Sequence, residues 1–214
     1  MPIMEDKFVI NIGRQLGSGG KAVGEAIAQR LGIGVYDKQL INLAAEQSGL
    51  CPEVFERVDE KESRNLFSTL VAYLRSPFVG SEYAGSNVLS NDALFKIQSD
   101  VIRDIAARES CVIVGRCADY VLRDDPNVAL VNLFVHAPLA ARIRRESART
   151  NTTPAEAEKR IRQVDKERAA YYNFFSSKRW GDAQAYDLCV NTDGLEISEV
   201  AKLVLRYLEL RGLR

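Results

Sequence analysis

A glycine cluster lies between an apolar segment and an amphipathic one in the stretch FVINIGRQLGSGGKAVGEAIAQRLG, residues 8–32. Glycines let the backbone approach a ligand that any side chain would keep at a distance. The free N–H groups and the dipole at the start of the following helix suit a phosphate. A glycine-rich turn that binds nothing is the alternative. The predicted phosphate contacts are Gly17, Ser18, Gly19, Gly20 and Lys21.

The lysine of this loop does not stand where the common pattern G-x-x-x-x-G-K-[ST] puts it. When the helices are aligned, Gly20 takes the place of the lysine, Lys21 that of the hydroxyl residue, and Ala22 follows. The ammonium group is displaced by one residue, about 100° around a helix of 3.6 residues per turn. Arg14, three residues before Gly17, could supply a cation from the loop instead. Arg14 and Lys21 are therefore both candidate catalytic cations.

Two further candidates follow apolar segments. Asp37 comes directly after GVY, and Arg116 comes directly after CVIVG, with Asp119 one turn further on. In α/β proteins ligands bind at the carboxyl ends of the strands, which favours a binding role for these side chains. A helix N-cap is the alternative for Asp37, and a solvated side chain at a helix start is the alternative for Arg116.

Basic residues gather between residues 140 and 179, where eleven of the forty residues are lysine or arginine. Arginines spaced by three and four residues share one helix face, and TPAE at residues 153–156 is a capping box that begins a second helix. Two basic helices joined by TNTTP predict a lid that closes over phosphates. A solvated basic hairpin is the alternative. The residues concerned are Arg142, Arg145 and Arg149 on the first helix, and Arg160, Asp165 and Arg168 on the second.

The elements that must position these residues alternate between short apolar segments and helical patterns, which is typical of a parallel sheet covered by helices. Apolar residues at a spacing of four, from Val23 to Leu31, predict a helix that ends at Gly32. Residues from about 40 to 100 predict a helical insert, interrupted by a mobile loop over residues 75–92. The candidate strands are residues 8–12, 34–36, 111–114, 129–135 and 187–190.

Composition excludes several classes of protein. The 29 basic and 29 acidic residues balance, which argues against binding to nucleic acid or an anionic membrane. No signal peptide is seen and the apolar runs are short, so a soluble, cytoplasmic protein is expected. The four scattered cysteines predict reduced thiols, and the single His136 disfavours a multi-histidine metal site or a serine-histidine triad.

Taken together, the motifs resemble the cytidylate kinase-like family, whose members are relatives of the P-loop nucleoside monophosphate kinases. The resemblance rests on GRQLGSGGKAVGEAIAQRLGIGVYDKQLI, CVIVGRCADYVL, EKRIRQVDKERAAYYNFF and KRWGDAQAYDLCVNT, which follow in the family's order over nearly the whole chain. It implies a single domain with a three-layer α/β P-loop kinase fold around a parallel five-stranded sheet. The implied parts are a core (1–39, 101–140 and 181–214), a helical insert (about 40–100) and a helical lid (about 141–180).

The resemblance also implies phosphoryl transfer from ATP, with Mg²⁺, to a nucleoside monophosphate, and it alone picks CMP or dCMP as the acceptor. Such transfer mainly requires the protein to position anions and neutralise their charge, and arginine side chains can do both. By resemblance, Arg116 clamps the acceptor phosphate, Asp119 holds its sugar or base, and Asp37 is a general base or a magnesium-water anchor. Arg160 and Arg168 contact phosphates, with Asp165 orienting Arg168.

Two alternatives stay open. One is a P-loop kinase for another small phosphate or alcohol acceptor. The other is a nucleotide-binding protein without turnover, which would be consistent with the displaced lysine. No sequence pattern indicates the metal ligands or the oligomeric state.

Overall fold

The computed structural model describes residues 7–37 and 91–214 of the chain. The chain divides into two compact units, Met1–Asp37 with Ile105–Arg214 and Lys38–Asp104. Helix α5 (Asn91–Arg108) begins in the second unit and confirms the helix expected from residue 92 onward. The remainder of the predicted insert and its loop, up to residue 90, lies outside the described residues, as does Cys51.

The first unit is built on a five-stranded sheet in which every strand pairing is parallel. The order across the sheet is β2-β3-β1-β4-β5. All five predicted strands are confirmed, although β1 extends two residues beyond its predicted end. The strands are β1 (Phe8–Arg14), β2 (Gly34–Tyr36), β3 (Cys111–Ile113), β4 (Ala129–His136) and β5 (Leu188–Asn191).

The central strand β1 has β3 on one side and β4 on the other. From β1 the chain continues to β2 on one side of the sheet, whereas β4 and β5 extend the other side. A doubly wound sheet binds its ligands at the carboxyl ends of its strands, where the strand order switches. The glycine-rich loop follows the carboxyl end of β1 and therefore lies at that position.

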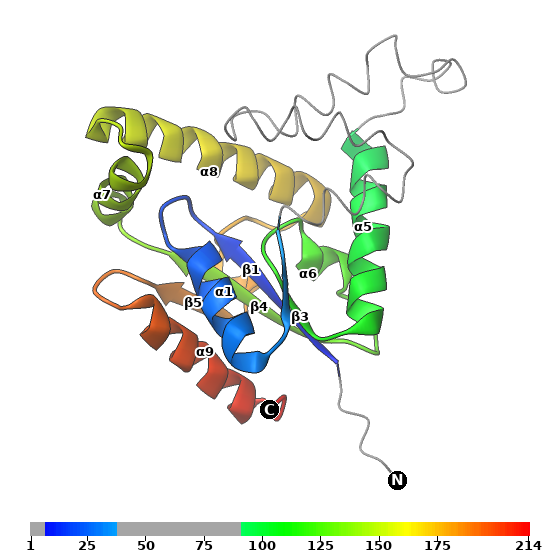
Figure 1. Cartoon of the computed structure of the whole chain (residues 1–214). Helices are drawn as coiled ribbons and strands as arrows, with labels where there is room; N and C mark the ends of the chain where they lie inside the picture. Colours follow the sequence, from blue (N-terminus) through cyan, green and yellow to red (C-terminus); the bar gives the residue numbers. More distant parts are fainter. Residues whose placement is uncertain (1–6, 38–90) are drawn as a thin grey trace, which may run out of the picture. The chain divides into compact units, whose positions relative to one another are not determined.

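One face of the sheet is covered by α1 (Gly20–Leu31) and α9 (Ile197–Leu210), which lie side by side (Figure 1). The apolar spacing of four buries Val23 and Ile27 of α1 against the sheet, and Gly32 ends the helix in the left-handed conformation, as predicted. The core on this face includes Ile10, Ile12, Val112, Val114, Leu133, Val135, Val200, Val204 and Leu208. It fixes β1 and α1, the two elements on either side of the loop.

Helices α6 (Ala118–Val121), α7 (Leu139–Thr150) and α8 (Pro154–Ser176) complete the unit, with a short 3₁₀ helix at Ala183–Ala185. The capping box predicted at Thr153 is present, because its hydroxyl accepts from the Glu156 amide and the Glu156 carboxylate accepts from the Thr153 amide. Helix α8 runs across the end of the sheet toward which β1 points (Figure 1). No helix within the described residues could cross a membrane.

Candidate functional site

The glycine-rich loop forms a tight turn that is closed by its own backbone. The carbonyl of Gln15 accepts hydrogen bonds from the Ser18 amide at 3.3 Å and from the Ser18 hydroxyl at 2.8 Å. Gly17 and Gly19 have φ angles of 78° and 81°, in the left-handed region that favours glycine. Ser18 is fully buried. Its hydroxyl and amide are therefore engaged within the loop, which gives Ser18 a structural role there.

A run of backbone amides in and after this loop has no hydrogen-bond acceptor among the described residues. The first amide of α1 that is bonded is that of Val23, which donates to the Gly19 carbonyl at 2.9 Å. Free N–H groups at a helix start, reinforced by the helix dipole, form an anion-binding concavity. The free amides belong to Gly17, Gly19, Gly20, Lys21 and Ala22.

Both candidate cations of the loop lie beside Asp37. The guanidinium Nη2 of Arg14 is 3.6 Å from Asp37 Oδ1, and the Lys21 Nζ is 3.8 Å from Oδ2. The two differ in burial, because the Arg14 side chain is 19% exposed and the Lys21 side chain 57%. Arg14 also packs against Gly115, where a Cβ would lie only 2.0 Å from its Nη1. Arg14 is thus held in place, whereas Lys21 is a solvated cation.

Arg14, Arg116 and Arg168 act on one another as like charges. The Nη1 of Arg168 donates to the Arg14 carbonyl at 3.0 Å. Burial lowers the pKa of Arg14, the charges of Arg168 and Arg116 lower it further, and Asp37 opposes them. Burial also lowers the pKa of Arg168, with Asp165 and Asp37 opposing and Arg116 adding to the effect. A bound anion would relieve this mutual repulsion.

Arg116 lies in an unusual backbone turn at the end of β3. Gly115, Arg116 and Cys117 have φ angles of 82°, 63° and 52°, so three consecutive residues are left-handed. For the two that carry a Cβ this conformation costs roughly 1–2 kcal/mol each. Among the described residues, no hydrogen bond or ion pair holds the Arg116 side chain. Strain of this kind is concentrated at functional sites. Here the strained residue, Arg116, carries a guanidinium group that is available for a ligand.

Asp119 is buried in α6, and its carboxylate connects that helix to α8. Its Oδ2 accepts a hydrogen bond from the Tyr172 hydroxyl at 2.7 Å, and its Oδ1 has no partner among the described residues. Burial and the hydrogen bond to Asp119 raise the pKa of Tyr172. The bond between Tyr172 and Asp119 was not predicted from the sequence. The predicted contact of Asp119 with the acceptor stays a prediction.

Replacing Tyr172 by phenylalanine is expected to lower the free energy of unfolding by about 1–3 kcal/mol, because the buried Asp119 carboxylate would then lose its hydrogen-bond donor among the described residues. Urea denaturation measures this difference. Tyr207→Phe is the matched control, since it removes a hydroxyl that accepts a hydrogen bond from the exposed Arg211; its change should stay within about 0.5 kcal/mol. Equal losses in both variants would contradict a structural role for the bond between Tyr172 and Asp119.

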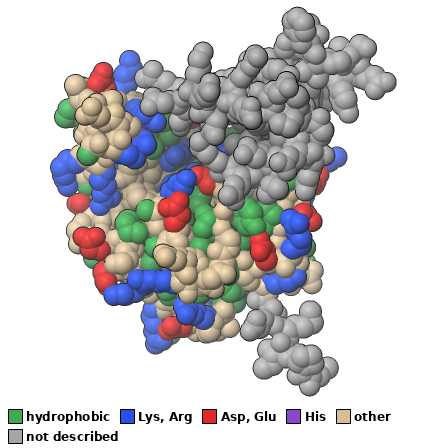
Figure 2. Space-filling model, viewed as in Figure 1, with side chains coloured by type: hydrophobic (Ala, Val, Ile, Leu, Met, Phe, Trp, Pro, Cys, Tyr) green, Lys and Arg blue, Asp and Glu red, His purple; other side chains and the backbone are tan. Residues whose placement is uncertain are grey.

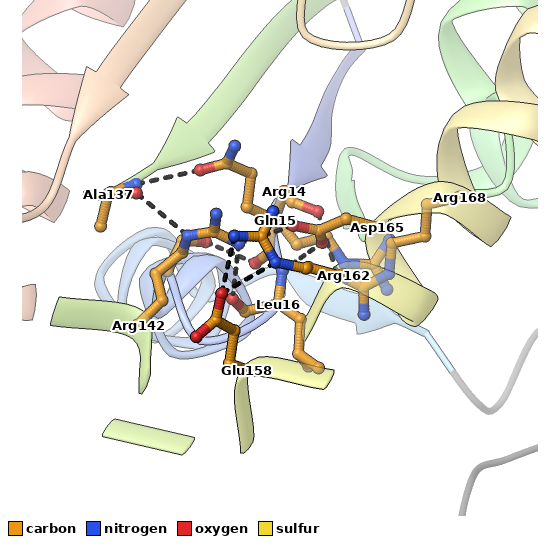
Figure 3. Close-up of polar contacts among 10 residues, drawn as sticks. Arg14, Gln15, Leu16, Ala137, Arg142, Glu158, Arg162, Asp165 and Arg168 are labelled. Carbon is orange, nitrogen blue, oxygen red and sulfur yellow. Dashed lines mark hydrogen bonds and ion pairs between the residues drawn. The ribbon is translucent and has the colours of Figure 1, made fainter. Parts of the chain in front are cut away.

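Arg142 and Asp165 form a largely buried ion pair that holds the loop. Arg142 Nη1 lies 2.6 Å from Asp165 Oδ2, and it also donates to the Leu16 carbonyl at 3.3 Å (Figure 3). Asp165 Oδ1 accepts from the Leu16 amide at 2.8 Å. The hydrogen bonds of Asp165 therefore go to Arg142 and Leu16, whereas Arg168, which it was predicted to orient, is affected through charge.

The other predicted lid arginines also have partners within the protein. Arg145 donates to the Thr192 hydroxyl at 2.9 Å and to its carbonyl at 2.8 Å. The buried carboxylate of Glu146 pairs with Arg149 at 2.7 Å and with Arg160 at 3.3 Å. Basic side chains gather on the part of the surface formed by α7 and α8 (Figure 2). Of the predicted lid arginines, Arg142 contacts the loop at Leu16, and Arg168 contacts Arg14.

Sequence reasoning missed Thr192. Its hydroxyl donates to the Ser18 carbonyl at 2.7 Å, and its side chain is fully buried. A hydroxyl residue directly after β5, at the same edge of the sheet as the loop, was the available signal.

Comparison with known proteins gives a family and a fold. The sequence model of the cytidylate kinase-like family matches residues 9–194. A cytidylate kinase of Methanobrevibacter smithii is 23% identical over 204 residues, covering 95% of this chain and 99% of the relative. Two solved structures share the fold. An uncharacterized protein from Eubacterium ventriosum has a TM-score of 0.69 at 24% identity, covering 95% and 99% of the two chains. A shikimate kinase from Bacteroides thetaiotaomicron has 0.54 at 16%, covering 94% and 98%.

Proposed function

We propose that this chain, which belongs to the cytidylate kinase-like family, transfers the γ-phosphoryl group of ATP to a nucleoside monophosphate, with CMP or dCMP preferred. The observation that carries the proposal is the placement of three guanidinium groups beside a loop with free amides: Arg168 donates to the Arg14 carbonyl, and Arg14 packs against Gly115, the neighbour of Arg116. This arrangement is suited to bringing two phosphate groups together, because the positive charges offset the electrostatic repulsion between the two anions.

Each part has a role in this reaction. The free amides, those of Gly17 and of Gly19 to Ala22, bind the phosphates of ATP, and Arg14 neutralises the charge that spreads over the transferring group. Arg116 binds the acceptor phosphate through two parallel hydrogen bonds, leaving a phosphate oxygen as the nucleophile. Arg168 neutralises charge from the α8 side. Asp37 orients the Arg14 guanidinium at 3.6 Å.

Magnesium would enter with ATP. No group of three or more acidic, histidine or cysteine side chains within the described residues is placed to hold a metal ion. Lys21 provides no hydroxyl where common P-loops have one, so the protein offers Asp37 beside the loop. Mg²⁺ typically takes one or two carboxylates and completes its shell with substrate phosphates and water, which fits this arrangement. When bound, the ion would offset the negative charge of the phosphate oxygens, which otherwise repels the nucleophile.

Release of ADP by the purified protein, measured with CMP, dCMP, UMP, AMP and GMP in turn, tests the proposal. We expect ADP release to depend on the acceptor and to be fastest with CMP or dCMP. The preference for cytosine is supported by the family and by the M. smithii relative. A fastest rate with another nucleoside monophosphate would overturn the choice of base and leave the reaction class intact.

The displaced lysine supports a second candidate, a nucleotide-binding protein without turnover. Gly20 and Lys21 occupy the positions where common P-loops carry the lysine and the hydroxyl residue that follows it. Tight ATP binding by calorimetry, without ADP release in the presence of any monophosphate, would select this candidate. ADP release that appears only with a different small acceptor would instead select a P-loop kinase of another specificity.

A further inference from the structure

The carbonyl groups of the phosphate loop are held from outside by two side chains that the proposed reaction does not use. Arg142 Nη1 donates to the Leu16 carbonyl at 3.3 Å, and the Thr192 hydroxyl donates to the Ser18 carbonyl at 2.7 Å. Both side chains are buried. Arg142 comes from α7 and Thr192 follows β5, so two separate parts of the unit hold alternate peptide groups of one loop.

A held carbonyl determines the direction of the next amide. In a planar trans peptide group, the C=O of one residue and the N–H of the next point in opposite directions. The bond from Arg142 to Leu16 therefore turns the Gly17 amide away from α7, and the bond from Thr192 to Ser18 turns the Gly19 amide away from Thr192. Both amides lack an acceptor among the described residues.

We propose that Arg142 and Thr192 are positioning residues that direct the amides of Gly17 and Gly19 toward the nucleotide phosphates. This inference rests on the proposed function, because it assumes that the loop binds a nucleotide. Glycine peptide groups rotate freely unless something outside the loop holds them. A preorganised set of donors binds an anion without a cost of ordering at the moment of binding.

Each positioning residue is itself held. Asp165 accepts from Arg142 at 2.6 Å and from the Leu16 amide at 2.8 Å, so Leu16 is bonded on both sides (Figure 3). Arg142 Nε also donates to the Ala137 carbonyl at 3.0 Å. Arg145 donates to both oxygens of Thr192. Gly17 packs so closely on α7 that an added Cβ would lie 2.8 Å from the Arg142 carbonyl oxygen.

The experiment uses the isotope-labelled full-length protein and ADP as the probe, with the amide proton shifts of Gly17 and Gly19 followed by NMR. Thr192→Val keeps the side-chain shape and loses the hydroxyl, whereas Thr192→Ser keeps the hydroxyl. For Thr192→Val we expect the Kd for ADP to rise about tenfold, which corresponds to about 1.4 kcal/mol. The ADP-induced downfield shift should vanish at Gly19 and persist at Gly17, and Thr192→Ser should restore it.

Arg142→Gln gives the reciprocal test, with the shift lost at Gly17 and retained at Gly19. This variant keeps the inference testable if Thr192→Val does not fold. An unchanged Kd and an unchanged Gly19 shift in folded Thr192→Val would overturn the inference, as would loss of both shifts in both variants. If the wild-type protein does not bind ADP, the proposed function fails first; if it binds ADP and only the variant result fails, the inference fails alone.

Discussion

Replacing Arg14 by methionine is expected to lower kcat by roughly two to four orders of magnitude, the scale of one lost contact to transition-state charge. Arg14 is the last residue of the central strand, is mostly buried, and lies among Asp37, Arg116 and Arg168. The low solvent exposure of its guanidinium strengthens its interaction with a transferring phosphoryl group. Steady-state ADP release at saturating ATP and acceptor measures the loss.

Lys21→Met is the informative comparison, because the sequence left Arg14 and Lys21 as equal candidates for the displaced cation. Lys21 is 57% exposed, so water and salt screen its charge, and a smaller loss of kcat is expected. Arg206→Met on the exposed side of α9 is the control for the same chemical change, with activity unaltered. A kcat for Arg14→Met within a few-fold of wild type would mean that another cation, such as Arg168, neutralises the transferring group.

Arg116→Lys is expected to raise the KM for the monophosphate far more than the KM for ATP. Lysine keeps the charge but offers one point of contact, whereas the guanidinium matches two phosphate oxygens. Arg116→Ala should weaken the acceptor further, by about 1.5–3 kcal/mol, the value of a hydrogen bond to a charged group. Steady-state kinetics with each substrate varied in turn separates the two KM values.

The pattern of the two KM values decides how the Arg116 result is interpreted. Equal increases for ATP and for the acceptor would indicate a general defect in folding rather than a lost contact. No change in either value would place the acceptor site away from the turn at Gly115 and Arg116. The glycine loop and α8 would then be the remaining support for a kinase.

Local patterns were sufficient to predict most of the described fold. The apolar spacing from Val23 to Leu31 with Gly32 after it located α1, and TPAE located the start of α8. Such signals depend on neighbours within a few residues, which the sequence presents directly. The end of β1 was less certain, because Gly13 and Arg14 carry no apolar signal and are extended only through pairing with β4.

The sequence predicted the positions of candidate site residues along their helices, but not their contacts. The spacing of Arg142, Arg145 and Arg149 places them along α7 but does not say what they contact. Arg142 pairs with Asp165 of the next helix, and the Thr192 hydroxyl bonds to Ser18, which lies 174 residues earlier in the chain. These contacts depend on the tertiary arrangement of α7, β5 and the loop, which cannot be inferred from local sequence patterns.

The most direct test of the proposed function identifies the product of the reaction. Phosphorus NMR of the wild-type protein with ATP, Mg²⁺ and CMP follows every phosphate group in one sample. The proposed function predicts that CDP and ADP appear in equal amounts, at a rate that depends on CMP and falls sharply in Arg14→Met. ATP that remains unchanged beside CMP, or ADP that appears with inorganic phosphate and without CDP, would contradict phosphoryl transfer to this acceptor.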